Sequence, residues 1–215
     1  MTARAFCFDN DGTLYSYPEN FGRDIVERMI AYLAKLMRVS PEYADSKRAE
    51  LFQKYGVKSI LFVFYQEGIL DSDRIHDFIR STYLSVDPGT YNIAVDPQLR
   101  STLQVLGGLL YVHTNSPAEF AEKILDYLGI KDLFAGIFGI FEHDGYGKPD
   151  PRSFGRLLRE IPALMERWYI DDGVVNLVAA HELGFKTVLI GNSPSEPSSF
   201  QPDLCLSRVS DLVTM

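Results

Sequence analysis

Several features that would place this chain outside the ordinary globular class are scarce or absent. Only two of its 215 residues are cysteines, Cys7 and Cys205, and they form no CxxC pair. We therefore expect two reduced, buried thiols in a cytoplasmic protein and no disulfide framework. No apolar run approaches 18 residues and no cleavable leader is recognisable. The sequence thus predicts neither a membrane span nor a signal peptide.

Positive charge is also in short supply. The formal net charge is −8, whereas a general nucleic-acid surface needs a basic patch. We expect no nucleic-acid partner, and any anionic ligand must be attracted by a metal or by a few lysines and arginines. The apolar content of 46% is that of a globular protein. The length allows one large core with an inserted subdomain.

Two carboxylates stand at the end of the first apolar run, within residues 6–14. If the extended conformation continues past the strand, Asp9 and Asp11 lie on the same side. Gly12 permits the tight turn that follows. Two acids at the end of a buried strand are costly unless a cation or strong donors neutralise them. We interpret the stretch as a metal-assisted site, although Asp-Gly alone would indicate only a loop.

The next part of the chain, residues 19–85, has the three-and-four periodicity of helices. Helices are expected to start near Glu19, Ser40–Pro41 and Asp71–Ser72, with a dense apolar segment at 60–65. Segments 15–18 and 87–90 contain Pro or Gly and are natural hinges. We therefore expect a helical cap at 17–89 that is inserted into a core made of 1–16 and 90–215.

From Pro97 onward, strand-like and helical segments alternate. Strands are expected at 109–113, 137–141, 168–170 and 186–190, with helices at 97–106, 116–128, 150–161 and 176–183. We expect Ser116 to cap the second of these helices and segment 192–199 to be an exposed loop. The alternation predicts an α/β fold with a Rossmann-like parallel sheet, which binds ligands at the carboxyl ends of its strands.

Polar residues follow four of the expected strands: Asp9 with Asp11, Thr114–Asn115–Ser116, Lys148, and Asp171–Asp172. Each has a simpler interpretation: Thr114 as part of a helix cap, Lys148 as a solvated lysine, and the paired acids as a turn. Because parallel strand ends converge, we expect one cleft with carboxylates for Mg²⁺ and donors for a phosphate. We interpret His113, among apolar neighbours, as structural.

These residues resemble the four signature motifs of the haloacid dehalogenase-like hydrolases, from Phe6 to Ile190. The matching segments are Asp9–Leu14, Thr114–Asn115, Lys148–Asp150 and Asp171–Asp172. The resemblance implies a Rossmann-like core with a helical cap inserted after the first motif. Further similarity to the pyrimidine 5'-nucleotidase branch comes from Tyr15, segment 128–134, Tyr55–Gly56 and Asn176. Val57 and Lys58 stand where members of that branch carry small hydroxyl residues.

The resemblance also implies roles for individual residues. Asp9 would attack the substrate phosphorus to give an aspartyl-phosphate, and Asp11 would act as general acid and then base. Asp9, Asp172 and the backbone carbonyl of Asp11 would hold Mg²⁺, and Asp171 would orient a water molecule. Lys148 would neutralise charge between the nucleophile and the phosphoryl oxygens.

Other residues would bind or position the substrate. Thr114 would donate a hydrogen bond to the phosphate, Asn115 would position its neighbour or a substrate oxygen, and Arg152 is either an auxiliary cation or a surface residue. The candidates for substrate contacts near the hinges and in the cap are Tyr15, Tyr17, Lys54, Tyr55, Lys58 and Tyr65.

Asp11 separates two reaction types, because a halide leaving group needs no proton whereas an alkoxide does. We therefore favour a phosphatase over a dehalogenase. The expected function is a Mg²⁺-dependent phosphomonoesterase for a small phosphorylated metabolite, with a nucleoside 5'-monophosphate foremost. Two alternatives are a sugar-phosphate or phosphoglycolate-type phosphatase and a non-catalytic member that binds a phosphate ligand.

Overall fold

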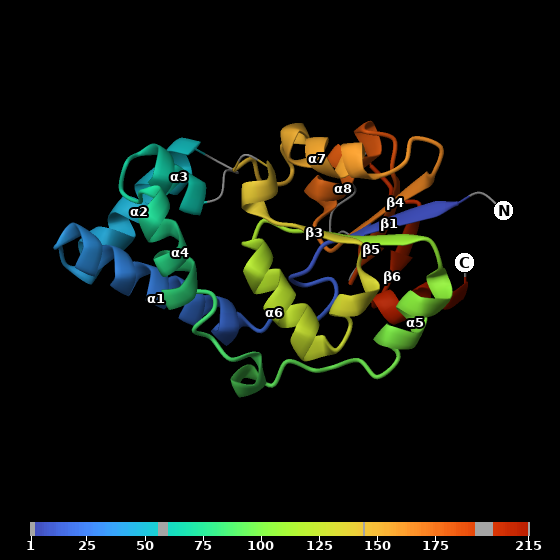
Figure 1. Cartoon of the computed structure of the whole chain (residues 1–215), viewed down its shortest axis with the longest axis horizontal. Helices are drawn as coiled ribbons and strands as arrows, with labels where there is room; N and C mark the ends of the chain where they lie inside the picture. Colours follow the sequence, from blue (N-terminus) through green and yellow to red (C-terminus); the bar gives the residue numbers. More distant parts are fainter. Residues whose placement is uncertain (1–2, 56–59, 144, 192–199, 215) are drawn as a thin grey trace.

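The computed structural model describes residues 3–55, 60–143, 145–191 and 200–214. Its centre is a parallel sheet with strand order β3-β2-β1-β4-β5-β6 (Figure 1). The strands are β1 (Arg4–Phe8), β2 (Leu109–His113), β3 (Gly136–Phe138), β4 (Glu166–Asp171), β5 (Lys186–Ile190) and β6 (Leu204–Leu206). The chain reverses its direction of travel across the sheet beside β1, and ligands bind at the carboxyl edge near such a reversal. The predicted α/β fold is confirmed.

Alternating side chains of β1 contribute to two apolar layers. Phe6 and Phe8 pack on the face covered by α5 (Leu99–Leu106), α6 (Ala118–Leu128) and the 3-10 helix η5 (Val209–Thr214). Ala5 and Cys7 pack on the opposite face with α7 (Gly155–Glu160) and α8 (Val174–Glu182). Figure 1 shows these two groups of helices on opposite sides of the sheet. Both faces are therefore covered, which is why the strands are apolar without alternation.

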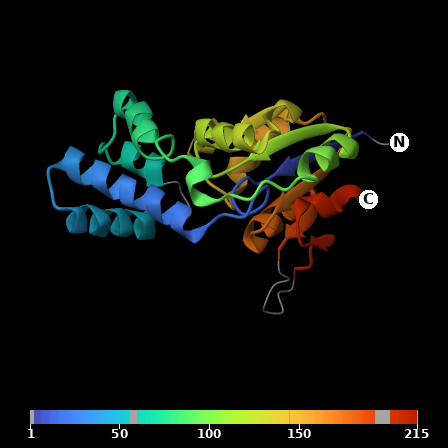
Figure 2. The same cartoon turned by 90° about the horizontal axis from the view of Figure 1, so that it is seen from below.

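Before α5, four α-helices of the described chain follow β1: α1 (Glu19–Met37), α2 (Pro41–Tyr55), α3 (Ile60–Gln66) and α4 (Ser72–Ser81). They form a separate lobe beside the sheet (Figure 2). Two of the predicted starts are confirmed by side-chain caps. The Ser40 hydroxyl accepts a hydrogen bond from the Tyr43 N–H at 3.3 Å, and the Asp71 carboxylate accepts one from the Arg74 N–H at 3.0 Å. The exact domain limits at 17 and 89 stay a prediction.

The structure corrects three expectations and adds one strand. β3 ends at Phe138, because Gly139 passes so close to the start of α6 that a Cβ there would lie 2.4 Å from the Ala118 nitrogen. The expected helix at 150–161 is divided into a 3-10 turn and α7. β6 was not predicted, and Cys205 within it is exposed, unlike the buried Cys7. The loop expected at 192–199 lies outside the described residues.

A membrane-spanning segment would require a long, strongly apolar helix. Across the described ranges, no helix combines the length and the apolarity that a crossing needs.

Candidate active site

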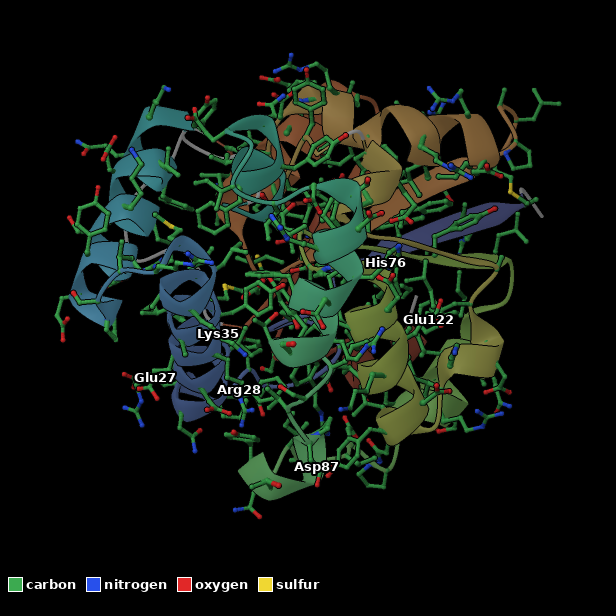
Figure 3. All side chains as sticks on the ribbon, turned by 60° about the vertical axis from the view of Figure 1, so that its left-hand side comes forward. Glu27, Arg28, Lys35, His76, Asp87 and Glu122 are labelled. Atoms are coloured by element: carbon green, nitrogen blue, oxygen red, sulfur yellow. The ribbon has the colours of Figure 1, made fainter. Side chains whose placement is uncertain are left out.

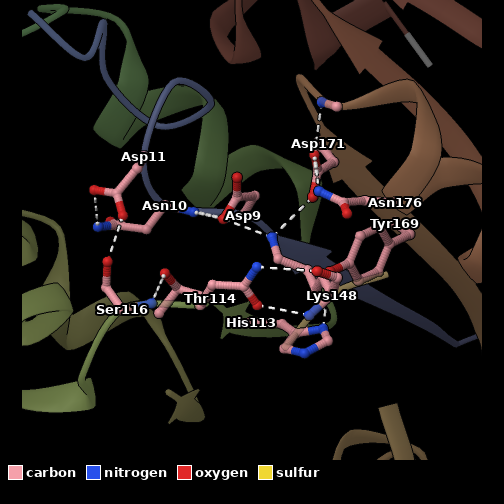
Figure 4. Close-up of polar contacts among 12 residues, drawn as sticks. Asp9, Asn10, Asp11, His113, Thr114, Ser116, Lys148, Tyr169, Asp171 and Asn176 are labelled. Carbon is pink, nitrogen blue, oxygen red and sulfur yellow. Dashed lines mark hydrogen bonds and ion pairs between the residues drawn. The ribbon is translucent and has the colours of Figure 1, made fainter. Parts of the chain in front are cut away.

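Asp9 lies directly after β1, in the interior of the molecule. Its backbone N–H donates to the Ile170 carbonyl at 2.8 Å, so the pairing of β1 with β4 extends to this residue. The Lys148 ammonium lies 2.7 Å from Asp9 Oδ1 and 2.9 Å from Asp171 Oδ2 (Figure 4). Residues from three distant parts of the chain therefore meet at the carboxyl edge of the sheet.

Lys148 is held by the segment that follows β2. The side-chain oxygen of Asn115 accepts a hydrogen bond from the Lys148 N–H at 2.7 Å, and the Asn115 amide donates to the Lys148 carbonyl at 3.1 Å. The lysine is only 4% exposed. Its interpretation as a solvated loop residue is therefore wrong, and Asn115 acts on the backbone of its neighbour in space.

Burial and charge oppose one another at this ion pair. Burial raises the pKa of Asp9 and the charge of Lys148 lowers it, with the nearby Asp171 raising it again. Burial alone would lower the pKa of Lys148, but the carboxylates of Asp171 and Asp9 hold it above its ordinary value. The lysine is therefore charged at neutral pH, and its two acidic neighbours compete for one cation.

The end of β4 presents two acids with different surroundings. Asp171 is fully buried, and its Oδ1 accepts hydrogen bonds from the Gly173 N–H at 2.7 Å and from Asn176 at 2.9 Å. Asp172 is exposed and lies against Gly12, where a Cβ would be 2.4 Å from Asp172 Oδ2. Gly12 also has φ +89°, which favours glycine. A side chain at position 12 would thus displace the Asp172 carboxylate.

The acids suit a hard divalent cation. One carboxylate oxygen from each of Asp9, Asp171 and Asp172 lies within 4.8 Å of the others. Opposite oxygen ligands of Mg²⁺ are about 4.2 Å apart, since each bond is 2.0–2.1 Å. Three carboxylates around one ammonium group leave surplus negative charge. Burial raises the pKa of Asp172, and the negative charge of Asp171 raises it further. The donor set therefore fits Mg²⁺, which would offset this charge.

Asp11 lies apart from this ion cluster and has its own set of donors. Ser116 Oγ donates to its Oδ2 at 2.9 Å, the Tyr15 hydroxyl donates to its Oδ1, and the Asn10 amide donates to Oδ1 at 3.1 Å. Burial raises the pKa of the Asp11 carboxyl, and the hydrogen bonds from Tyr15 and Ser116 oppose the rise. Asp11 is thus oriented by neighbours on both sides.

The expected cap at Ser116 is wrong. Pro117 occupies the N-cap position of α6 without a side-chain hydrogen bond, and the Ser116 hydroxyl turns to Asp11 instead. The sequence places Ser116 near the cleft but does not reveal its contact with Asp11, because a serine before a proline at a helix start looks like an ordinary cap. The Thr114 hydroxyl, 1% exposed, accepts a hydrogen bond from the Ser116 N–H at 3.0 Å. Its contact with a substrate phosphate stays a prediction.

His113 lies beneath the site, on β2. Its Nδ1 is 2.8 Å from the Tyr169 hydroxyl, and its ring centre is 4.4 Å from that of His143. Burial lowers the pKa of His113, and His143 and Lys148 lower it further. A neutral histidine packed among aromatic rings agrees with a structural role.

The remaining candidates are dispersed. Arg152 pairs with Asp150 through its Nε at 2.9 Å and is exposed, as a surface arginine would be. Lys54 and Tyr55 both contact Glu67 in the helical lobe. Tyr15 is 4% exposed, whereas Tyr17 is 39% and Tyr65 46% exposed. Gly56, Val57 and Lys58 lie outside the described residues.

The fold and the site define a class: Rossmann-like α/β proteins with a helical insertion after the first strand and an acid–lysine centre at the carboxyl edge of the sheet. Within this class the sequence profile of the haloacid dehalogenase-like hydrolases matches residues 3–184. The chain belongs to this family. The resemblance to the pyrimidine 5'-nucleotidase branch is not tested by this match.

Three relatives illustrate the comparison. Phosphate metabolism protein 8 of Saccharomyces cerevisiae is 25% identical over 202 residues; the alignment covers 86% of this chain but 61% of the yeast protein's length. A 2-haloacid dehalogenase from Pseudomonas syringae has a TM-score of 0.64 at 22% identity, covering 98% of this chain and 96% of the other. A phosphatase from Thermococcus onnurineus has a TM-score of 0.62 at 19% identity, with the same coverage. The two structures share the fold.

Proposed function

We propose that this protein is a Mg²⁺-dependent phosphomonoesterase that acts through an aspartyl-phosphate on Asp9. The observation that supports it most is that the site contains two acids in different surroundings. Asp9 is buried and bound to Lys148, whereas Asp11 has hydrogen-bond partners of its own. The two acids can then differ in protonation, as a nucleophile and a proton donor must.

The reaction has two displacements. A carboxylate oxygen of Asp9 forms a bond to phosphorus, the bond from phosphorus to the leaving oxygen breaks, and Asp11 gives that oxygen its proton. Asp11 then removes a proton from a water molecule, whose oxygen attacks phosphorus and releases Asp9. Lys148 stabilises the phosphoryl oxygens, and Thr114 donates to one of them.

Asp9, Asp172 and the Asp11 carbonyl would hold Mg²⁺, with Asp171 as the adjoining acid. When bound, the ion neutralises phosphoryl charge and fixes the position of the transferred group. Lys148 and the hydrogen bonds to Asp171 keep the carboxylates in place before the substrate arrives.

We expect a nucleoside 5'-monophosphate as the substrate, with sugar phosphates and phosphoglycolate as the alternatives. The nucleotide is supported by the motifs that resemble those of pyrimidine 5'-nucleotidases. The name of the yeast relative refers to phosphate metabolism, which agrees with a phosphorylated substrate. The helices α1 to α4 would act as a cap over the substrate. Tyr17 is a candidate contact for the leaving group, since it is partly exposed two residues after Tyr15.

The test is phosphate release by the purified protein with Mg²⁺ from a panel of purine and pyrimidine monophosphates, sugar phosphates and phosphoglycolate. Asp9→Asn removes the nucleophile, so we expect turnover to fall by about a thousandfold or more. Asp73→Asn is the matched control, because Asp73 is exposed on α4 and should leave turnover unchanged.

Three outcomes would contradict the proposal. Release of halide from 2-haloacids without phosphatase activity would indicate the chemistry named for the Pseudomonas structure. Binding of phosphate esters without turnover would indicate a non-catalytic member. Turnover that survives in Asp9→Asn would exclude this residue as the nucleophile.

A further inference from the structure

A groove of about 750 Å³ lies on the helical lobe, between α1 and α4. Every described residue that lines the groove lies on one of these two helices, except Arg38, which directly follows α1. Figure 3 shows Arg28 and Lys35 along α1, on the side that α4 adjoins. The groove is therefore separate from Asp9, Lys148 and the other residues of the candidate active site.

The lining is unusually basic for this protein. Arg28, Lys35, Arg38 and Arg74 face a single carboxylate, that of Asp77, whereas the whole chain carries a net charge of −8. Cationic side chains that lie close together repel one another unless a ligand or neighbouring acids neutralise their charge. Among the side chains that line the groove, four are cationic and one is anionic.

Nearby acids neutralise only part of this charge. Asp24 pairs with Arg28 at 2.9 Å, and Asp71 pairs with Arg74 at 3.2 Å. Asp77 accepts a hydrogen bond from the Tyr32 hydroxyl at 2.9 Å. Among the residues that the structure describes, neither the Lys35 nor the Arg38 side chain has an ion-pair or hydrogen-bond partner, and both are exposed.

We infer that the α1–α4 groove binds a small organic molecule that carries a di- or triphosphate group. Arg28 and Lys35 are seven residues apart on α1, about 10 Å at a rise of 1.5 Å per residue, and Arg38 follows the helix. Several phosphate groups in a row can therefore contact more of these long side chains at once than one phosphate can. Arginine forks and lysine ammonium groups are the usual partners of phosphate oxygens. Tyr32 and Leu36 supply an apolar surface for the organic part, and the volume is that of a small-molecule site.

The test is calorimetric titration of the full chain with inorganic triphosphate in EDTA, where binding does not depend on turnover. We expect binding that weakens from low to physiological salt, where the screening length is about 8 Å. Lys35→Glu combined with Arg38→Glu should weaken it about tenfold or more. Arg23→Glu combined with Arg159→Glu makes the same change in net charge outside the groove and should leave the affinity within about threefold.

Four outcomes would overturn the inference. One is no binding by the unaltered chain, and another is equal weakening in both double variants, which would indicate only general charge. A third is binding that survives in the groove variant but is lost in Lys148→Met, which would place triphosphate in the active site. The fourth is tighter binding of a poly-glutamate peptide, which would indicate an acidic protein surface as the partner. If the double reversal does not fold, Lys35→Ala with Arg38→Ala replaces it.

Discussion

At the scale of single residues, one ammonium group holds two carboxylates that would otherwise repel each other. Lys148 contacts Asp9 and Asp171 at 2.7 and 2.9 Å in a site from which water is largely excluded. Taking such charges out of water is costly, and only mutual pairing compensates for it. We therefore expect Lys148 to stabilise the folded chain as well as a bound phosphate.

Lys148→Met should reveal this second role. Without the cation, Asp9 and Asp171 face each other unpaired, and we expect the free energy of unfolding in EDTA to fall by about 3 kcal/mol or more. Urea unfolding measures it. Lys186→Met is the control, since Lys186 pairs with Glu166 in an exposed position and should cost less than about 1 kcal/mol. Equal losses in the two variants would contradict a special role for Lys148.

Tyr15 tests whether a buried hydroxyl positions Asp11 or binds substrate. Its hydroxyl donates to Asp11 and its ring is buried, so Tyr15→Phe should lower kcat about tenfold and leave KM within about twofold. Steady-state kinetics on the best phosphate ester gives both constants, with Tyr17→Phe as the comparison. A rise in KM at unchanged kcat would instead support the original prediction that Tyr15 binds substrate.

At the scale of elements, a polar network ties α1 to the segment that returns from the helical lobe to the sheet. Asp24 on α1 accepts hydrogen bonds from Arg28 at 2.9 Å and from Tyr91 in the 3-10 helix η1 (Pro88–Tyr91). Arg28 also donates to Ser85 at 3.2 Å. The two ends of the helical insertion are thus joined by charge-assisted hydrogen bonds rather than by packing alone.

This network makes stability depend on pH. The hydrogen bond from Tyr91, with help from Arg28, lowers the pKa of Asp24 in the folded protein. Its stabilisation is present above the unfolded pKa of about 3.9 and is lost as pH falls through the lower folded value. Asp24→Asn should therefore cost about 1 kcal/mol at pH 7, and the difference from the unaltered chain should shrink below about pH 4.

Urea unfolding at pH 7, 5 and 3.5 provides the measurement for Asp24→Asn. Glu27→Gln is the control, because Glu27 is exposed in the middle of α1 and its pair with Arg23 is long, at 3.9 Å. A stability difference for Asp24→Asn that stays constant down to pH 3.5 would show that the carboxylate charge is not what joins α1 to η1.

At the scale of the whole molecule, the sheet brings the acids together at one edge. Mg²⁺ bound to these acids should therefore stabilise the folded chain. An ion that binds only the folded state adds about 2.7 kcal/mol at a hundred times its Kd. For a chain of this length we expect Mg²⁺ to raise the Tm by about 5–10 °C. The shift should vanish in Asp172→Asn and persist in Asp73→Asn. A melting temperature that does not respond to Mg²⁺ would count against the metal site.

The sequence by itself determined the fold class and the core of the site. Apolar runs alternate with helical periodicity, which requires a parallel sheet covered on both faces. In such a sheet the strand ends share one edge, so the sequence alone predicts that Asp9, Lys148 and Asp171 lie together. The same reasoning assigns the acid pair at the end of β4 and the lysine after β3 to the site.

Only the tertiary structure decided which donors surround each acid. Ser116 contacts Asp11 across 105 residues of sequence, and Asn115 holds Lys148 across 33. Such contacts depend on the angles at which loops leave the sheet, and local pattern contains no information on those angles. The same holds for the break at Gly139, which arises from the approach of α6, and for the α1–α4 groove, whose cations come from two helices. Periodicity defines the buried face of a helix, whereas packing defines what lies beside the exposed one.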